Sequence, residues 1–228
     1  VVGHLGIARL GLGLGHRGVA ARHRGGALAG VELYHGGTSS NNINARQTRI
    51  APSREGAKAK YAMSAREMTH DDIDRVQRDF VEAAQRARDL GFDIVYVYGA
   101  HGYLMTQFLS SVHNRRTDSY GGSIVGRARF QLETMERVRM AIGEDCAVAT
   151  RMCIDGRDGT KGVHIDEMLE FIALAMNSPM TVSLVGRTTT GSSSSLPPPW
   201  VTTASSGLNP STCSASFERK PTGMRSGK

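Results

Sequence analysis

Cysteine is scarce in this chain: only Cys146, Cys153 and Cys213 occur in 228 residues. None of them forms a CxxC pair, so the sequence supports neither a disulfide framework nor a zinc or iron–sulfur site. Cys146 stands in an apolar run, where we expect a small core residue. This cysteine usage predicts no metal site in the chain and a reducing, cytoplasmic setting.

Long apolar runs are also lacking. No uninterrupted run approaches the roughly 18 residues that are needed to span a bilayer, so we expect no membrane association. The first fifteen residues are fairly apolar, but His4 and Arg9 interrupt them and no basic stretch precedes them. A signal peptide is therefore not expected.

Acidic residues are missing from one end and rare at the other. Residues 1–30 carry four arginines and no acid, whereas residues 176–228 carry five basic residues and one acid. Residues 31–175 hold 19 basic and 20 acidic side chains, so the net charge of +7 belongs to the ends. The nearly neutral middle has no basic patch interleaved with aromatics, and we therefore expect a small-molecule partner rather than a nucleic acid.

The two ends differ from the middle in composition. Residues 1–25 are rich in Gly, Arg and His, and residues 176–228 hold twelve serines, eight threonines and six of the seven prolines. Because such a tail buries too little apolar surface to offset its ordering entropy, we expect it to be disordered. We divide the chain into an irregular end (1–25), a folded middle (26–175) and this tail, and wrong-frame translation would explain both ends. The start at Val1 predicts that the natural beginning lies upstream.

The middle alternates between strand and helix patterns. The predicted strands are short and apolar, and the predicted helices repeat apolar residues at helical spacing with acidic residues near their starts. The strands cover about 29–37, 92–98 and 146–152, and the helices about 69–91, 123–142 and 164–175. This order predicts an α/β fold with parallel strands covered by helices, either a (β/α)8 barrel or a doubly wound sheet.

Chemistry in both folds collects at the carboxyl ends of the strands. In "YVYGAHGYL" (96–104), Tyr98 ends a strand, and the turn that follows can return His101 over the strand mouth. A phenol and an imidazole that converge there could polarise or deprotonate a bound group, and Tyr103 could supply a further proton. The alternative is that these tyrosines are core aromatics and that His101 bonds only to backbone.

Two isolated charges stand in apolar strands. Arg151 is the only charged residue of "CAVATRMCI", and Glu32 is the only one of "GVELY". A buried arginine needs an acceptor, which a cofactor oxygen or a neighbouring carboxylate would supply. Glu32 could accept a hydrogen bond from a cofactor N–H or pair with Arg151, and the spacing leaves both interpretations open.

Two further motifs have competing interpretations. "GLGHRG" (13–18) matches GxGxxG, which would bind a dinucleotide only between a strand and a helix, and its flanks suit neither. "NRRTDSYGG" (114–122) could clamp an anion through Arg115 and Arg116. We favour a tightly hydrogen-bonded loop, with Asp118 bonded locally.

Together, "GALAGVELYHGG", "GFDIVYVYGAHGYLMTQFLSSVHNRRTDSYGGS", "RARFQLETMERVR" and "DCAVATR" resemble the old yellow enzyme family of flavin oxidoreductases. The likeness is closest to its trimethylamine, dimethylamine and histamine dehydrogenase branch, and it covers residues 26–175. The resemblance implies a partial FMN-binding (β/α)8 barrel, an α/β TIM barrel of which these strands would be the third, fourth and fifth.

The resemblance also implies roles for the candidate residues. Tyr98 and His101 match the pair that binds substrate beside the flavin, and Tyr103 matches a proton donor. Glu32 matches a residue that contacts the flavin ring, and Arg151 an arginine near its N1 and O2 edge. Ene-reductases of the family usually have His where Tyr98 stands, so the likeness favours amine oxidation over enone reduction.

Several parts of the family pattern have no counterpart here. Strands one, two and six to eight are not matched, nor are the phosphate-binding loops. The cysteines that hold a [4Fe–4S] cluster in the amine dehydrogenases are also absent, so such a cluster would belong to a full-length parent protein. The resemblance is compatible with a homodimer of that parent. We expect that parent to be an enzyme. The alternatives are a non-catalytic frameshifted fragment and an ene-reductase that uses NAD(P)H.

Overall fold

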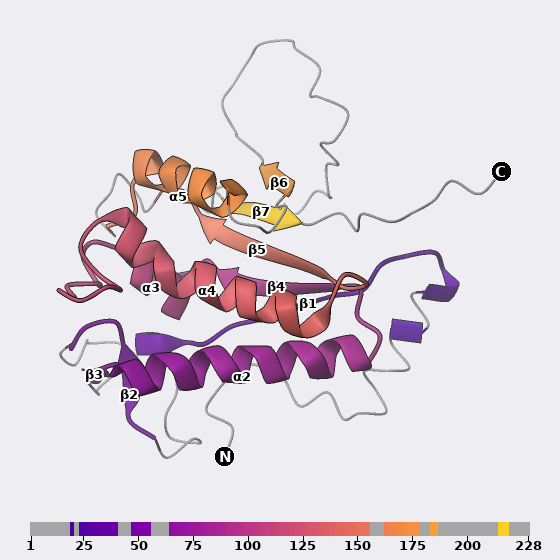
Figure 1. Ribbon diagram of the computed structural model, residues 1–228, viewed down its shortest axis with the longest axis horizontal. Helices are drawn as coiled ribbons and strands as arrows, with labels where there is room; N and C mark the ends of the chain where they lie inside the picture. Colours follow the sequence, from indigo (N-terminus) through magenta and orange to yellow (C-terminus); the bar gives the residue numbers. More distant parts are fainter. Residues whose placement is uncertain are drawn as a thin grey trace, which may run out of the picture.

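The computed structural model describes residues 19–20, 23–40, 47–55, 64–155, 162–177, 183–186 and 214–218. Its central feature is a sheet with helices α2, α4 and α5 packed along it (Figure 1). The strands are β1 Gly30–Leu33, β2 Arg49–Ala51, β3 Ala65–Glu67, β4 Ile94–Gly99, β5 Ala147–Cys153, β6 Ser183–Gly186 and β7 Ser214–Glu218. The helices are η1 Gly37–Ser39, α2 His70–Asp89, α3 Leu104–Leu109, α4 Ile124–Ile142 and α5 Ile165–Asn177.

The main sheet has the order β1-β4-β5-β7-β6. Strands β1, β4 and β5 are parallel, and each lies beside the next one in the chain. A doubly wound sheet reverses its strand order at a switch point, whereas a barrel advances steadily in one direction. The steady advance from β1 through β4 to β5 fits a barrel and also fits one half of a doubly wound sheet, and the described strands form an open sheet.

One face of these strands carries the hydrophobic core. Leu33, Val95 and Val97 alternate with residues of the other face and are fully buried against α2 and α4. A second cluster packs α5 against α4 and β5 through Met152 and Phe171. Because α2 and α4 cover the same face, the opposite face of β1, β4 and β5 is left for other groups.

Helix α2 begins as its sequence predicts. The Thr69 hydroxyl accepts a hydrogen bond from the backbone N–H of Asp72, whose carboxylate accepts one from the Thr69 N–H, so that the two form a capping box. The Arg66 guanidinium beside Asp72 lowers the pKa of that carboxyl. The helix buries Ile73 and Phe80 on one face, which confirms the predicted amphipathic helix.

The three predicted strands and three predicted helices are all present, with ends shifted by a few residues. Cys146 is 1% exposed, and burial raises the pKa of its thiol, as expected for a core residue. No helix in the described part of the chain is long and apolar enough to cross a membrane.

The ends of the chain are described only in part. The GxGxxG match at 13–18 and Cys213 lie outside the described residues, as does most of the irregular end 1–25. Within the tail 176–228, β6 and β7 pair with each other, and β7 adds antiparallel to β5. Residues 176–177 end α5, and the rest of that tail lies outside the described residues, so the division into three regions stays a prediction.

Candidate active site

The candidate residues gather on the face of the sheet that α2 and α4 leave uncovered. The register places Glu32 of β1 beside Tyr96 of β4, and Tyr98 of β4 beside Arg151 of β5. Side chains two residues apart on a strand share a face, so Glu32, Tyr98 and Arg151 all project to the same side. They lie near the carboxyl ends of the three parallel strands, where barrels carry their chemistry.

Tyr98 and His101 are in direct contact. The phenol oxygen of Tyr98 is hydrogen-bonded to Nδ1 of His101, and the two rings stack with centroids 5.7 Å apart. His101 has a φ of +57°, in the left-handed region that non-glycine residues rarely adopt. The turn therefore folds back over the end of β4, and it joins the imidazole to the phenol as the sequence predicts.

Tyr98 is held in its neutral form. The residue is 5% exposed, and burial is the main cause that raises the pKa of its phenol. The charge of Glu32 raises the pKa further, whereas the charge of Arg151 lowers it. At neutral pH the phenol therefore keeps its proton and can act as a hydrogen-bond donor or as one link of a proton relay.

Two further tyrosines complete an aromatic cluster. Tyr103 lies with its ring centroid 6.0 Å from that of Tyr98 and 6.4 Å from that of His101. Tyr34 stacks on Tyr103 at 4.8 Å and meets Tyr98 edge-on at 6.5 Å. Sequence reasoning missed Tyr34, although the two-residue period from Glu32 along "VELY" would have placed it on the same face.

Glu32 and Arg151 form an ion pair that spans β4. Nη1 of Arg151 donates to Oε1 of Glu32 at 2.9 Å, and Cζ of Arg151 lies 5.8 Å from the centre of the Tyr98 ring. This distance is within the range of a cation–π contact. The pair thus leaves an acceptor and a donor side by side on the open face, next to the phenol.

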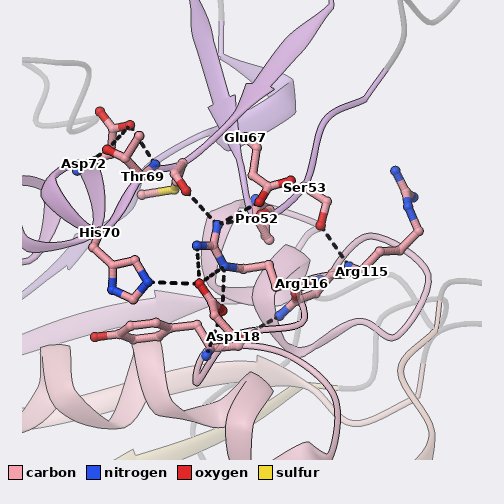
Figure 2. A network of polar contacts seen from close by, with 12 residues as sticks. Pro52, Ser53, Glu67, Thr69, His70, Asp72, Arg115, Arg116 and Asp118 are labelled. Atoms are coloured by element: carbon pink, nitrogen blue, oxygen red, sulfur yellow. Dashed lines mark hydrogen bonds and ion pairs between the residues drawn. The ribbon is translucent and has the colours of Figure 1, made fainter.

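Arg116 belongs to the structural framework. Its side chain is 4% exposed, and Figure 2 shows it at the centre of a polar network. Nη1 donates to the carbonyl oxygens of Pro52 and Met68 at 2.9 and 2.6 Å, and Nε donates to Asp118 at 3.0 Å. The same guanidinium lowers the pKa of Asp118 to about 2.

The rest of the 114–122 loop is likewise held by hydrogen bonds. The backbone N–H of Arg115 donates to Oγ of Ser53 at 2.8 Å, and Nη2 of Arg115 donates to the Arg54 carbonyl oxygen at 2.8 Å. Gly122 has a φ of +73°, and a Cβ on Gly121 would lie 2.0 Å from the Arg116 carbonyl oxygen. These contacts confirm the tightly bonded loop and give the two arginines partners within the chain.

The described ranges contain no set of side chains suited to bind a metal ion. No group of three or more His, Cys, Asp or Glu side chains there is placed to hold a metal ion. The described part of the open face offers instead the Tyr98–His101 pair, the Glu32–Arg151 ion pair and the phenols of Tyr34 and Tyr103.

Comparison with known proteins identifies the family. The profile of the NADH:flavin oxidoreductase / NADH oxidase family matches residues 17–188. The chain belongs to this family. Members of the family are flavin-dependent oxidoreductases, and the old yellow enzymes and amine dehydrogenases are among them.

Individual relatives place the chain in more detail. Dimethylamine dehydrogenase of Hyphomicrobium sp. (strain x) is 44% identical over 160 residues, which make up 67% of this chain and 22% of that protein. NADH oxidase of Thermoanaerobacter brockii is 36% identical over 156 residues, 66% of this chain and 24% of that protein. The chain thus spans about a quarter of the length of these relatives.

Solved structures agree with the fold. Histamine dehydrogenase from Rhizobium sp. 4-9 superposes with a TM-score of 0.69 at 34% identity, over 74% of this chain and 25% of that one. Morphinone reductase superposes with a TM-score of 0.55 at 33% identity, over 60% of this chain and 41% of that one. The resemblance and the partial (β/α)8 barrel that the sequence predicts are confirmed. The roles of the site residues stay predictions.

Proposed function

We propose that this chain is part of an FMN-dependent oxidoreductase that oxidises an amine by N-demethylation or deamination. In this proposal its residues bind the substrate and contact one edge of the flavin ring. The observation that carries the proposal is the Tyr98–His101 pair beside the Glu32–Arg151 pair at the mouths of neighbouring strands. The identity of 44% to a dimethylamine dehydrogenase supports an amine as the substrate class.

The residues on the open face suit a flavin ring. The pyrimidine edge of that ring has both an N–H donor and carbonyl acceptors, and the adjacent Glu32 carboxylate and Arg151 guanidinium offer the complementary groups. A positive charge at this edge favours the reduced, anionic ring. FMN, when bound, would accept the two electrons that leave the amine.

The chain's own residues would handle the protons. An alkylammonium must lose its N–H proton before its nitrogen lone pair can take part in oxidation. The Tyr98 phenol would take that proton while passing its own to Nδ1 of His101, so the net transfer runs from ammonium to imidazole. Tyr103, within the same cluster, would supply a further proton.

Cofactor binding tests the first half of the proposal. We expect FMN fluorescence to be quenched when the folded 228-residue chain is added, and Glu32→Gln combined with Arg151→Met to weaken that binding. A soluble, folded chain that leaves FMN fluorescence unchanged would contradict flavin binding by this chain and would favour a non-catalytic member of the family.

Substrate turnover tests the second half. With FMN bound, we expect dimethylamine to bleach the flavin absorbance under anaerobic conditions, and Tyr98→Phe to slow bleaching by about 10² to 10⁴-fold because the proton relay is broken. Tyr120→Phe is the matched control, since Tyr120 bonds to Glu133 and lies in a different cluster. Equal rates in wild type and Tyr98→Phe would refute the relay.

Enone reduction with NAD(P)H is the second candidate. It is favoured by the similarity to morphinone reductase and to a putative 12-oxophytodienoate reductase of Oryza sativa, which is 34% identical over 190 residues. Tyr98 and His101 would then serve as two donors to a carbonyl oxygen. Oxidation of NAD(P)H that depends on an added enone, without any reaction of amines, would favour this function.

A further inference from the structure

Gln107 of α3 stands out among the buried polar residues near the candidate site. Its side chain is 1% exposed, yet its amide bonds to three backbone groups in two loops that come from different strands. One loop follows β1 and the other follows β4. The amide therefore lies between the segments that carry Tyr34 and His101.

The first loop closes around the amide. Oε1 of Gln107 accepts a hydrogen bond from the Thr38 N–H at 3.2 Å, and Nε2 donates to the Gly36 carbonyl oxygen at 3.3 Å. Gly37, between them, has a φ of +56°, and a Cβ there would lie only 2.2 Å from Oε1. The glycine thus permits the loop to approach the amide closely.

The second loop is the turn that carries the imidazole. Nε2 of Gln107 also donates to the Gly102 carbonyl oxygen at 2.7 Å. His101 and Gly102 both have positive φ, at +57° and +71°. A left-handed conformation is strained for a histidine and persists only where its surroundings impose it. The bond to the Gly102 carbonyl oxygen is one contact that imposes this conformation.

The hydrogen-bond set requires an amide. Two N–H groups of Nε2 meet two carbonyl oxygens while Oε1 meets an N–H, so every contact has a donor and an acceptor. A leucine would make none of the three bonds. A glutamate carboxylate would place a second oxygen against two carbonyl oxygens, but a protonated glutamic acid would again present one donor and one acceptor.

We propose that Gln107 is a positioning residue: it clamps the two loops together and thereby holds His101 on Tyr98 and Tyr34 on Tyr103. This inference rests on the proposed function in one respect, namely that Tyr98 and His101 carry protons. Gln107 bonds to backbone groups of these loops and acts through the rings that the loops carry.

The rings report on the clamp without any cofactor. In the folded 228-residue chain we expect nuclear Overhauser contacts between the rings of Tyr98 and His101 and between those of Tyr34 and Tyr103. Gln107→Leu should abolish both pairs of contacts while the core resonances stay in place. Gln77→Leu is the matched control, because Gln77 is equally buried in α2 and donates to Glu133. Ring contacts that survive in a folded Gln107→Leu variant would overturn the proposal.

Gln107→Glu adds a rescue that a purely structural role outside the site would not produce. Because burial raises the pKa of a carboxyl, the new side chain should be protonated in mild acid and should then make two of the amide's three hydrogen bonds. We expect the ring contacts to be stronger at acidic pH than above neutrality, where the pattern of Gln107→Leu should appear, with the wild type compared at each pH. Ring contacts in Gln107→Glu that do not change with pH would also overturn the clamp.

The wild-type chain offers a measurement that depends on no variant. The Thr38 amide, which is bonded to a buried oxygen, should exchange with solvent as slowly as the amides of β4, and fast exchange would overturn the clamp. If the chain also oxidises an amine, Gln107→Leu should lower kcat by about 10²-fold with little change in KM, as expected for misplaced catalytic groups. A chain that shows the ring contacts but no turnover would refute the proposed function and leave the clamp intact.

Discussion

The charges of Glu32 and Arg151 should move the pKa of Tyr98 in opposite directions when each is removed. Cζ of Arg151 lies 5.8 Å from the centre of the Tyr98 ring. For an effective dielectric constant between about 20 and 80, a unit charge at that distance changes the free energy of phenol ionisation by about 0.7 to 3 kcal/mol. The Arg151 side chain is 22% exposed and the Glu32 side chain is 43% exposed, so solvent screening favours the lower half of this range.

We therefore expect the free energy of Tyr98 ionisation to change by about 1 kcal/mol when Arg151 is replaced, and in the opposite direction when Glu32 is replaced. Arg151→Met removes the cation that favours phenolate and leaves Glu32 unopposed, so the pKa of Tyr98 should rise. Glu32→Gln removes the anion and leaves Arg151 unopposed, so that pKa should fall. The double variant loses both charges and should return close to wild type.

The near-ultraviolet absorbance of tyrosinate measures this titration. The chain has six tyrosines, so the curve of Tyr98→Phe is subtracted from each variant to isolate Tyr98. Glu133→Gln is the control: Tyr120, whose pKa burial and a hydrogen bond to Glu133 raise to about 12, should shift downward while Tyr98 stays unchanged. Shifts of the same sign in the two single variants would refute the idea that the ion pair sets the field at Tyr98.

Three stability predictions follow from the framework. Asp118→Asn should lower the free energy of unfolding by about 2 kcal/mol, because the buried Arg116 loses the carboxylate of Asp118 and keeps the more distant carboxylate of Glu67 at 3.6 Å; urea unfolding measures this, and a change below 1 kcal/mol would contradict the network. In the wild type, the contribution of Asp118 should be complete above its usual pKa of 3.8 and should vanish as pH falls through about 2, which acid titration of the unfolding midpoint checks. Thr69→Ala should cost about 1 kcal/mol through the lost cap of α2, and Thr69→Ser should restore most of it in the same urea assay; equal losses in both variants would argue against the cap.

Local patterns were sufficient for the larger elements. The acidic start and the apolar period of α2, and the apolar runs of β4 and β5, are features of continuous stretches of chain, so sequence predicts these elements within a few residues of their observed bounds. Helix α3 was missed because its six residues are all buried, which leaves no polar face to reveal a helical period. Strands β2 and β3 were missed because each has only three residues.

The candidate site likewise has a part that local sequence patterns indicate and a part that depends on the tertiary structure. Tyr98, His101 and Tyr103 lie within six positions of one another, so strand alternation and a glycine-containing turn indicated that they could converge, with core packing of the tyrosines as the alternative. The sequence left two partners possible for Glu32, a cofactor N–H or Arg151. Its pairing with Arg151, 119 positions away, depends on the parallel register of three strands.

The sequence by itself therefore determined the α/β class, because the order of strand and helix patterns is read from short-range spacing. The resemblance of residues 26–175 to a known family indicated the family and the barrel, and local spacing left the phenol–imidazole turn as one of two interpretations. The tertiary structure decided which charges pair across β4, that Tyr34 stacks on Tyr103, and that Gln107 joins two loops. The ion pair, the Tyr34–Tyr103 stack and the bond from Gln107 to Gly36 each link residues about 70 or more positions apart. No local pattern carries such information, because only the packing of strands and helices brings those residues within bonding distance.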